Sequence, residues 1–127
     1  MKIRRRFTVP GEGPYRSIPF ETRNSRVRSA TGEVIFQQDD IEVPRDWSQL
    51  AVDILAQKYF RKAQVPAGFS PDGRENSARQ VFHRMAHTWT RWGKKYRYFD
   101  REEDADAFYD EICYMLATQM AAPNSPQ

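Results

Sequence analysis

Hydrophobic and polar positions follow a strand-like pattern early in the chain. Residues 20–43 hold β-branched and aromatic side chains on both sides of Thr31 and Gly32, two residues that supply turn chemistry. This pattern predicts a β-hairpin that pairs about 25–30 with 33–38. Because two strands alone are marginally stable, the hairpin is expected to pack against another element.

The pattern then becomes helical. A first helix is expected over about 46–63, with Asp46 as its N-cap and Gln49 completing a capping box. Val65 and Pro66 are expected to stop it, before a loop over 64–76. Its expected core face consists of Trp47, Leu50, Ala51, Ile54, Leu55 and Tyr59.

Two further helices are expected. Ser77 and Gln80 form a second capping box, and Gly93 is expected to end that helix. The third helix is expected to start at Asp100 as N-cap, with Glu103 in the capping-box position, and to end at Pro123. The expected core faces are Ala78, Val81, Phe82, Met85, Trp89 and Trp92 on the second helix, and Ala105, Phe108, Tyr109, Ile112, Met115, Leu116 and Met120 on the third.

These elements predict a mainly α fold, with three amphipathic helices and an N-terminal β-hairpin. Residues 1–19 are rich in proline and glycine, which predicts an arm with little regular structure. We therefore expect a basic N-terminal arm over 1–19 and one helical domain over 20–127. Trp47, Trp89 and Trp92 supply more apolar surface than three short helices need, so part of it is expected to face a partner.

Composition excludes several classes of protein. A length of 127 residues suits one domain, and no apolar run is long enough to cross a membrane or to form a secretory signal. The single cysteine, Cys113, excludes an internal disulfide and a structural zinc site built from several thiolates. This cysteine usage favours a reduced, cytoplasmic location.

The net charge of +3 is unevenly distributed. Residues 1–28 carry eight Lys or Arg side chains and two Glu, whereas 100–111 carry seven acids and one Arg. The basic arm and the acidic helix start could attract each other or attract outside partners.

Three side-chain groups are candidates for chemistry, but each of them favours a structural role. His83 and His87 have the i, i+4 spacing of a zinc pair, but Arg84 stands where a metalloprotease needs a glutamate, and no third ligand is evident. Cys113 lies in an apolar stretch next to acids, which opposes thiolate formation and favours core packing. The acids of 100–111 lack a calcium-loop spacing and favour a solvated helix face.

Basic and aromatic residues are mixed in two segments, IRRRF (3–7) and RWGKKYRYF (91–99). Such mixtures suit phosphate contacts and base stacking, so one alternative is a free-standing module that binds single-stranded nucleic acid. No known nucleic-acid motif accompanies them, and an arm that wraps a larger protein is equally consistent. The common phosphate-binding loops are absent from the sequence.

Four segments resemble the N-terminal region of the adenosylcobalamin-dependent (class II) ribonucleotide reductases, in their long bacterial form. The runs DILAQKYFRKA and AAPNSPQ are the most specific, because amphipathic patterning alone does not explain them. The four segments are IEVPRDWSQLAVDILAQKYFRKAQVP (41–66), SARQVFHRMAHTWTRWG (77–93), YFDREEDADAFYDEICYMLATQMAAPNSPQ (98–127) and, more weakly, SRVRSATGEVIF (25–36).

The resemblance implies a segment that precedes a ten-stranded α/β barrel. In this family the barrel reduces ribonucleotides to deoxyribonucleotides for DNA synthesis, using adenosylcobalamin to form a thiyl radical on a barrel cysteine. The reacting cysteines lie beyond position 127, and Cys113 matches none of them. The implied partners are the catalytic barrel, on the same or a separate chain, and a ribonucleotide, with a preference for diphosphates. The implied role of this chain is to pack on the barrel, without activity of its own.

The resemblance also implies a substrate contact. Asn124, Ser125 and Pro126 match the motif that leads into the first barrel strand, where the family binds the nucleotide. Short polar side chains in a proline-framed loop suit phosphate, although a plain helix-stopping turn is the alternative. The chain ends where the family continues, so a truncated, split or fragmentary reductase is expected. Two features depart from the family pattern: the loop over 67–76 is shorter, and the segment RWGKKYRYF is more basic. The sequence also contains no ATP-cone pattern.

Overall fold

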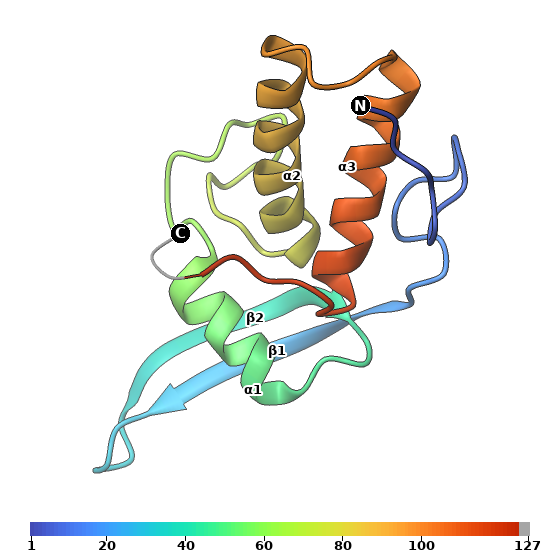
Figure 1. Ribbon diagram of the computed structural model, residues 1–127. Helices are drawn as coiled ribbons and strands as arrows, with labels where there is room; N and C mark the ends of the chain where they lie inside the picture. The colour runs from blue at the N-terminus through green and yellow to red at the C-terminus, as the bar shows by residue number, and fades with distance from the viewer. Residues whose placement is uncertain (125–127) are drawn as a thin grey trace. The chain divides into compact units, whose positions relative to one another are not determined.

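The computed structural model describes residues 1–124 and contains a hairpin followed by three helices (Figure 1). The chain divides into two compact units, Phe20–Val81 and Met1–Pro19 with Phe82–Gln127. Within residues 1–124, no helix has the length and hydropathy needed to cross a membrane. The elements are β1 (Phe20–Arg28), β2 (Val34–Pro44), α1 (Gln49–Ile54) with the π-helical turn η1 (Leu55–Tyr59), α2 (Ala78–Lys95) and α3 (Glu102–Ala117).

The predicted hairpin is confirmed and is longer than expected. Strands β1 and β2 pair antiparallel from Phe20↔Pro44 to Arg28↔Val34, and Gly32 has a φ of 89° in the connecting turn. The hairpin is buried away from its turn: Ser25, Ile41 and Val43 are fully buried, whereas Ile35 near the turn is 62% exposed. The hairpin packs on α1, as expected of a two-stranded sheet.

The first helix is shorter than predicted, and its predicted cap is wrong. Ser48, not Asp46, is the N-cap, and its hydroxyl accepts a hydrogen bond from the Ala51 amide at 3.1 Å. The helix ends at Tyr59, before the predicted 63, because Arg61 leaves it to pair with Glu75. The Glu75 amide donates to the Arg61 carbonyl at 2.9 Å, and the Glu75 carboxylate accepts from the Arg61 amide at 2.7 Å.

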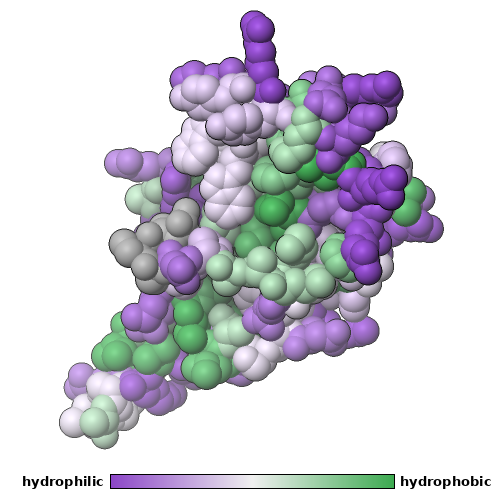
Figure 2. Space-filling model, in the orientation of Figure 1, coloured by the Kyte–Doolittle hydropathy of each residue, from purple (hydrophilic) through white to green (hydrophobic). Residues whose placement is uncertain are grey.

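The buried face of this helix also differs from the predicted one, and a π-helical turn follows it. Phe60 donates its amide to the Leu55 carbonyl five residues earlier, at 3.0 Å, so the side chains after Ile54 are rotated relative to an ideal α-helix. Val52, Leu55 and Ala56 are buried. The predicted core residues Leu50 and Ile54 are instead 69% and 41% exposed, and green atoms reach the surface over α1 in Figure 2.

Helix α2 starts as predicted and ends differently. The Ser77 hydroxyl accepts from the Arg79 amide at 3.1 Å, and the Gln80 side chain accepts from the Ser77 amide at 3.0 Å. The predicted stop at Gly93 is wrong, since the helix continues to Lys95 and Gly93 is buried. A Cβ at Gly93 would lie 2.4 Å from the Phe99 ring, so this glycine serves close packing. The predicted core residue Trp92 is 55% exposed.

Helix α3 is shifted relative to its predicted bounds. Arg101, not Asp100, is the N-cap, and Asp104 accepts from the Arg101 amide at 3.0 Å in the position assigned to Glu103. The helix ends at Ala117 rather than near Pro123, because Gln119 adopts a φ of 60° and Met120 donates to the Met115 carbonyl at 2.9 Å. The predicted core residue Met120 is therefore 55% exposed.

Each unit has its own small core. Alanine is frequent in both, which lets backbones approach closely. The buried apolar residues are Ile41, Val43, Val52, Leu55, Ala56, Phe60, Ala78 and Val81 in one unit, and Phe82, Ala86, Ala105, Ala107, Cys113, Leu116 and Ala117 in the other.

Candidate functional site

The predicted substrate residues begin in the loop after α3. Asn124 follows the left-handed turn at Gln119 and is exposed, so its amide is accessible to a ligand. Ser125 and Pro126 lie outside the described residues.

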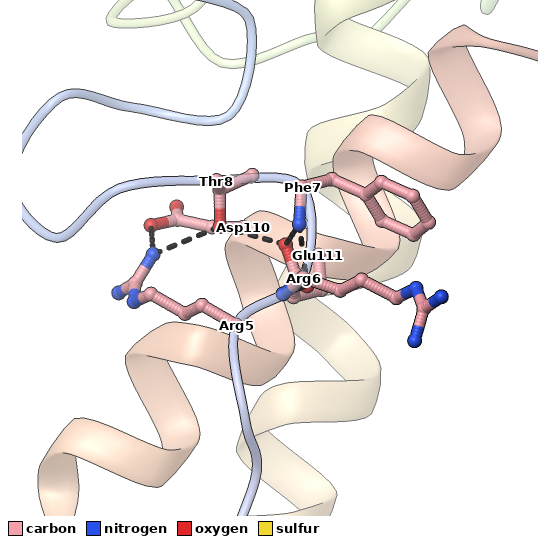
Figure 3. A network of polar contacts seen from close by, with 6 residues as sticks. All are labelled: Arg5, Arg6, Phe7, Thr8, Asp110 and Glu111. Carbon is pink, nitrogen blue, oxygen red and sulfur yellow. Dashed lines mark hydrogen bonds and ion pairs between the residues drawn. The ribbon is translucent and has the colours of Figure 1, made fainter.

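The N-terminal arm, residues 1–8, lies along α3 and is anchored by its acids (Figure 3). Glu111 is the central anchor, with a carboxylate that accepts from three consecutive residues of the arm. The Phe7 amide donates at 3.1 Å, the Thr8 hydroxyl donates at 2.7 Å, and the Arg6 amide donates to the same group. Glu111 is only 8% exposed, so the arm covers it.

Further contacts fix the arm on both sides of Glu111. Arg5 forms an ion pair with Asp110 at 2.6 Å, and both side chains are largely buried. The Ile3 amide donates to Asp104 at 2.9 Å, and the Phe7 ring stacks on Tyr114 with centroids 4.8 Å apart. The expectation of a solvated acidic face is therefore wrong for these acids, whereas attraction between the basic arm and the acidic helix is confirmed.

The pKa of Glu111 reflects two opposing effects. Burial raises the pKa of the carboxyl group, but the hydrogen bonds from Arg6, Thr8 and Phe7 outweigh it and hold the pKa below its ordinary value. The carboxylate is thus ionised at neutral pH and complements the arm's backbone donors. No sequence signal identified Glu111, because its partners are mostly backbone amides.

The histidine pair of α2 has a structural environment. The His83 ring nitrogen Nδ1 lies 2.7 Å from the Tyr109 hydroxyl, and the rings of His83 and His87 stack with centroids 5.1 Å apart. Burial, and then the neighbouring His87, lower the pKa of His83. Among residues 1–124, no group of three or more His, Cys, Asp or Glu side chains could hold a metal ion.

Cys113 is buried, as predicted, and is unreactive at neutral pH. Burial raises the pKa of its thiol to about 11, although hydrogen bonds with Tyr15 and Tyr109 act in the opposite direction. A nucleophilic cysteine needs a thiolate, which is scarce at such a pKa. The cluster of His83, Tyr109 and Cys113 is thus neutral and offers packing rather than catalysis.

A groove of about 1130 Å³ lies between the arm, α2 and α3. Its walls mix cations with carboxylates, and several of these charges already bind one another, as Arg5 and Asp110 do. The side chains that line it include Arg5, Thr8, His83, His87, Lys94, Asp106 and Asp110.

The two basic-aromatic segments differ in how exposed their side chains are. In IRRRF, Arg5 and Phe7 are engaged with α3. In RWGKKYRYF, the aromatic residues Trp92, Tyr96 and Tyr98 are each more than half exposed.

Comparison with known proteins identifies the family. The sequence model described as class II vitamin B12-dependent ribonucleotide reductase matches residues 21–119. The chain is 46% identical to the vitamin B12-dependent ribonucleotide reductases of Bradyrhizobium diazoefficiens and Agrobacterium fabrum, over 100% of its own length and 12% of theirs. It is 35% identical to the Streptomyces clavuligerus enzyme of the same name, over 99% of this chain and 13% of the relative.

The alignments also show where lengths differ. The match to the Bradyrhizobium enzyme extends over 155 positions, more than the 127 residues of this chain, so that relative contains insertions. The chain spans only about an eighth of the relatives it matches. On the family match and the full-length similarity, the chain belongs to the class II vitamin B12-dependent ribonucleotide reductase family.

Proposed function

We propose that this chain acts as the N-terminal segment of an adenosylcobalamin-dependent ribonucleoside-diphosphate reductase, an oxidoreductase of the cytoplasm. The observation that carries the proposal is the match of the whole chain to one part of much longer reductases. The segment has no catalytic cysteine of its own, since Cys113 is buried and its pKa is raised to about 11. The chain is therefore inactive alone.

The segment packs on the catalytic barrel through exposed apolar residues. Leu50 and Ile54 lie four residues apart on α1 and form a small exposed apolar strip, which the barrel could cover. Full burial of an exposed leucine or isoleucine contributes about 1.5–3 kcal/mol, and these two side chains would contribute less because each is already partly buried. This strip is our candidate for the contact with the barrel.

The loop after α3 presents Asn124, Ser125 and Pro126 to the ribonucleotide. The exposed amide of Asn124 supports this role, because amide and hydroxyl groups in a proline-framed loop suit phosphate oxygens. These residues bind and orient the nucleotide, while the radical chemistry belongs to the barrel.

The cofactor is held elsewhere in the enzyme. The groove beside α2 carries side chains of both charges among its apolar ones, such as Arg5, Lys94 and Asp106, and this mixed lining does not match the broad apolar face of a corrin ring. When bound, adenosylcobalamin supplies the radical that starts reduction. We assign no step of that chemistry to this segment.

Reconstitution tests the division of labour. The chain would be mixed with the Bradyrhizobium diazoefficiens reductase from which the matching N-terminal segment has been deleted. Reduction of ribonucleoside diphosphate should require both polypeptides and adenosylcobalamin. Turnover by the chain alone, or no gain on mixing, would refute the proposal.

Paired variants separate packing from substrate binding. Leu50→Gln should weaken association of the two polypeptides, whereas Asn124→Ala should leave association intact and raise KM for the nucleotide. Gln37→Ala, an exposed amide on the hairpin, is the matched control and should change neither. Unchanged association in Leu50→Gln would exclude the α1 strip as the contact, and an unchanged KM in Asn124→Ala would exclude the loop.

A further inference from the structure

The end of α2 gathers cations and aromatic rings on one surface. We call it the α2-end surface, and three of its rings are more than half exposed: Trp92 is 55% exposed, and Tyr96 and Tyr98 are each 59% exposed. Its residues are Thr88, Arg91, Trp92, Lys94, Lys95, Tyr96, Arg97 and Tyr98.

The chain turns back at the helix end and keeps these residues together. Arg97 adopts a φ of 57°, and the Tyr98 amide donates to the Gly93 carbonyl at 2.9 Å, which closes a left-handed cap. The rings of Tyr96 and Tyr98 have centroids 6.3 Å apart, and the Lys95 ammonium group lies 5.3 Å from the Tyr96 ring centroid. The cap therefore sets two tyrosines and a lysine side by side.

Most of the positive charge on this surface is not neutralised. Lys94 pairs with Glu102. Within residues 1–124, no carboxylate lies within ion-pair distance of Arg91, Lys95 or Arg97. Favourable interaction with the helix dipole accounts for Lys94 and Lys95 in the last turn, but not for the neighbouring exposed rings.

A shallow hollow lies within the α2-end surface. Its volume is about 440 Å³, in the range of pockets that hold small ligands, and it is lined by Thr88, Arg91, Trp92, Lys94 and Lys95. An indole beside cations matches a base with its phosphate, because the ring can stack on the base while the cations contact the phosphate. The two tyrosines outside the hollow can stack on neighbouring bases.

We propose that the α2-end surface binds single-stranded nucleic acid. Charge complementarity favours a polyanion, and the exposed rings favour one with unstacked bases over an acidic protein or a duplex. Arg5 and Phe7 of the basic arm are not part of this site, since they are bound to α3. The inference is independent of the reductase function and would stand if that proposal failed.

Fluorescence anisotropy of the full chain with labelled oligo-dT tests the proposal. An oligonucleotide of about 12 nucleotides spans such a site. Binding should quench tryptophan emission and should weaken roughly ten- to fiftyfold between about 50 and 200 mM salt, as expected for three or four phosphate contacts. No binding at the lower salt, a duplex bound as tightly as the single strand, or a mononucleotide bound as tightly as the oligonucleotide would overturn the proposal.

Variants locate the binding on this surface. Trp92→Ala should weaken binding about tenfold through loss of stacking. Lys95→Ala should make the salt dependence shallower by about 0.7 in log–log slope. Phe69→Ala and Lys58→Ala are matched controls, an exposed ring and an exposed cation that belong to the other compact unit, and should bind normally.

Two checks keep the result unambiguous. Circular dichroism of each variant would show that the helices are retained, and Arg91→Glu, which reverses a charge at an exposed position, should abolish binding without removing any ring. Equal affinity of Trp92→Ala, Arg91→Glu and the parent chain would place the binding elsewhere and refute the assignment.

Discussion

Glu111 shows how one buried carboxylate can order a segment that has no regular secondary structure. Its oxygens accept from Phe7 and Thr8 and from the Arg6 amide, so three successive arm residues are fixed by one side chain. Hydrogen bonds to a charged group contribute about 1.5–3 kcal/mol each when the group is buried. The arm is therefore held by backbone amides as well as by side chains such as Arg5, which pairs with Asp110.

Replacement of Glu111 tests this conclusion. Glu111→Gln keeps the shape but removes the charge, and the free energy of unfolding should fall by about 1.5–3 kcal/mol in urea denaturation. Glu103→Gln, an exposed acid on the same helix, is the control and should change the stability by less than about 0.5 kcal/mol. Equal losses in the two variants would show that Glu111 has no special role.

The same residue predicts a dependence on pH. The folded-state pKa of Glu111 lies below its ordinary value near 4.5, so the unfolded chain takes up the proton first as the pH falls. The stabilisation by the ionised Glu111 is fully present above about pH 5.5. It is lost as the pH falls through the folded-state pKa. Chemical denaturation between neutral and acid pH should show a smaller loss of stability in Glu111→Gln than in the parent chain.

Gly93 carries a second prediction at the level of one residue. Gly93→Ala would normally favour a helix, yet its new Cβ would meet the Phe99 ring at 2.4 Å, and that ring also packs on Phe108. We expect thermal or urea unfolding to show a net loss of about 1–2 kcal/mol. In a Phe99→Leu background the same change should be neutral or stabilising, and a stabilising effect in the parent chain would show that the ring moves aside freely.

Sequence patterns identified some residues at this scale and missed others for physical reasons. The burial of Cys113 and the pairing of Ser77 with Gln80 follow from local chemistry and were predicted correctly. Gly93 was misread as a helix stop because close approach of Phe99 and a left-handed cap both favour glycine. The left-handed caps are instead Arg97 and Gln119, two residue types that give no signal for this conformation.

At the scale of elements, the first helix shows how tertiary contacts set helix length. The apolar spacing predicted a continuous helix, but the Arg61–Glu75 pairing ends it early, and the buried face is that of Val52, Leu55 and Ala56 rather than that of Leu50 and Ile54. No local pattern shows a contact across the loop. Element type was therefore predictable, whereas the ends of the elements and their buried faces were not.

The start of this helix offers a direct test. Ser48→Ala should lower the free energy of unfolding by about 1 kcal/mol, because the Ala51 amide loses its acceptor. Asp46→Ala, at the cap position favoured by the sequence, should have little effect. Urea denaturation of both variants decides between the two caps. A larger loss of stability in Asp46→Ala than in Ser48→Ala would show that Asp46 is the N-cap.

At the scale of the whole chain, the most informative contact joins its first residues to its last helix. Removal of residues 1–8 would leave Asp104 and Glu111 without their arm partners, and we expect a loss of at least about 3 kcal/mol in urea denaturation. Adding Asp104→Asn, Asp110→Asn and Glu111→Gln to the shortened chain should recover part of that loss, because the three carboxylates that have lost their arm donors are then neutral. If these substitutions recovered no stability, the arm would stabilise α3 only by covering its surface, and not by donating hydrogen bonds to its carboxylates.

The candidate substrate site was the least accessible to prediction at this scale. Asn124, Ser125 and Pro126 were found by resemblance and not by chemistry, because a short polar loop has few distinguishing features. The sequence shows mixed basic and aromatic residues both in the α2-end surface and in the arm. The structure distinguishes the two, because the rings of the α2-end surface are exposed, whereas Arg5 of the arm is paired with α3.

The contact between Glu111 and the arm has a consequence for synthesis. The two partners are about a hundred positions apart in sequence, so the arm leaves the ribosome long before the helix that receives it exists. Until α3 emerges, the basic N-terminus has no acceptor for its amides and remains open to other anionic surfaces in the cell. Completion of this unit must therefore wait for nearly the entire segment to be translated, which makes it a late folding event.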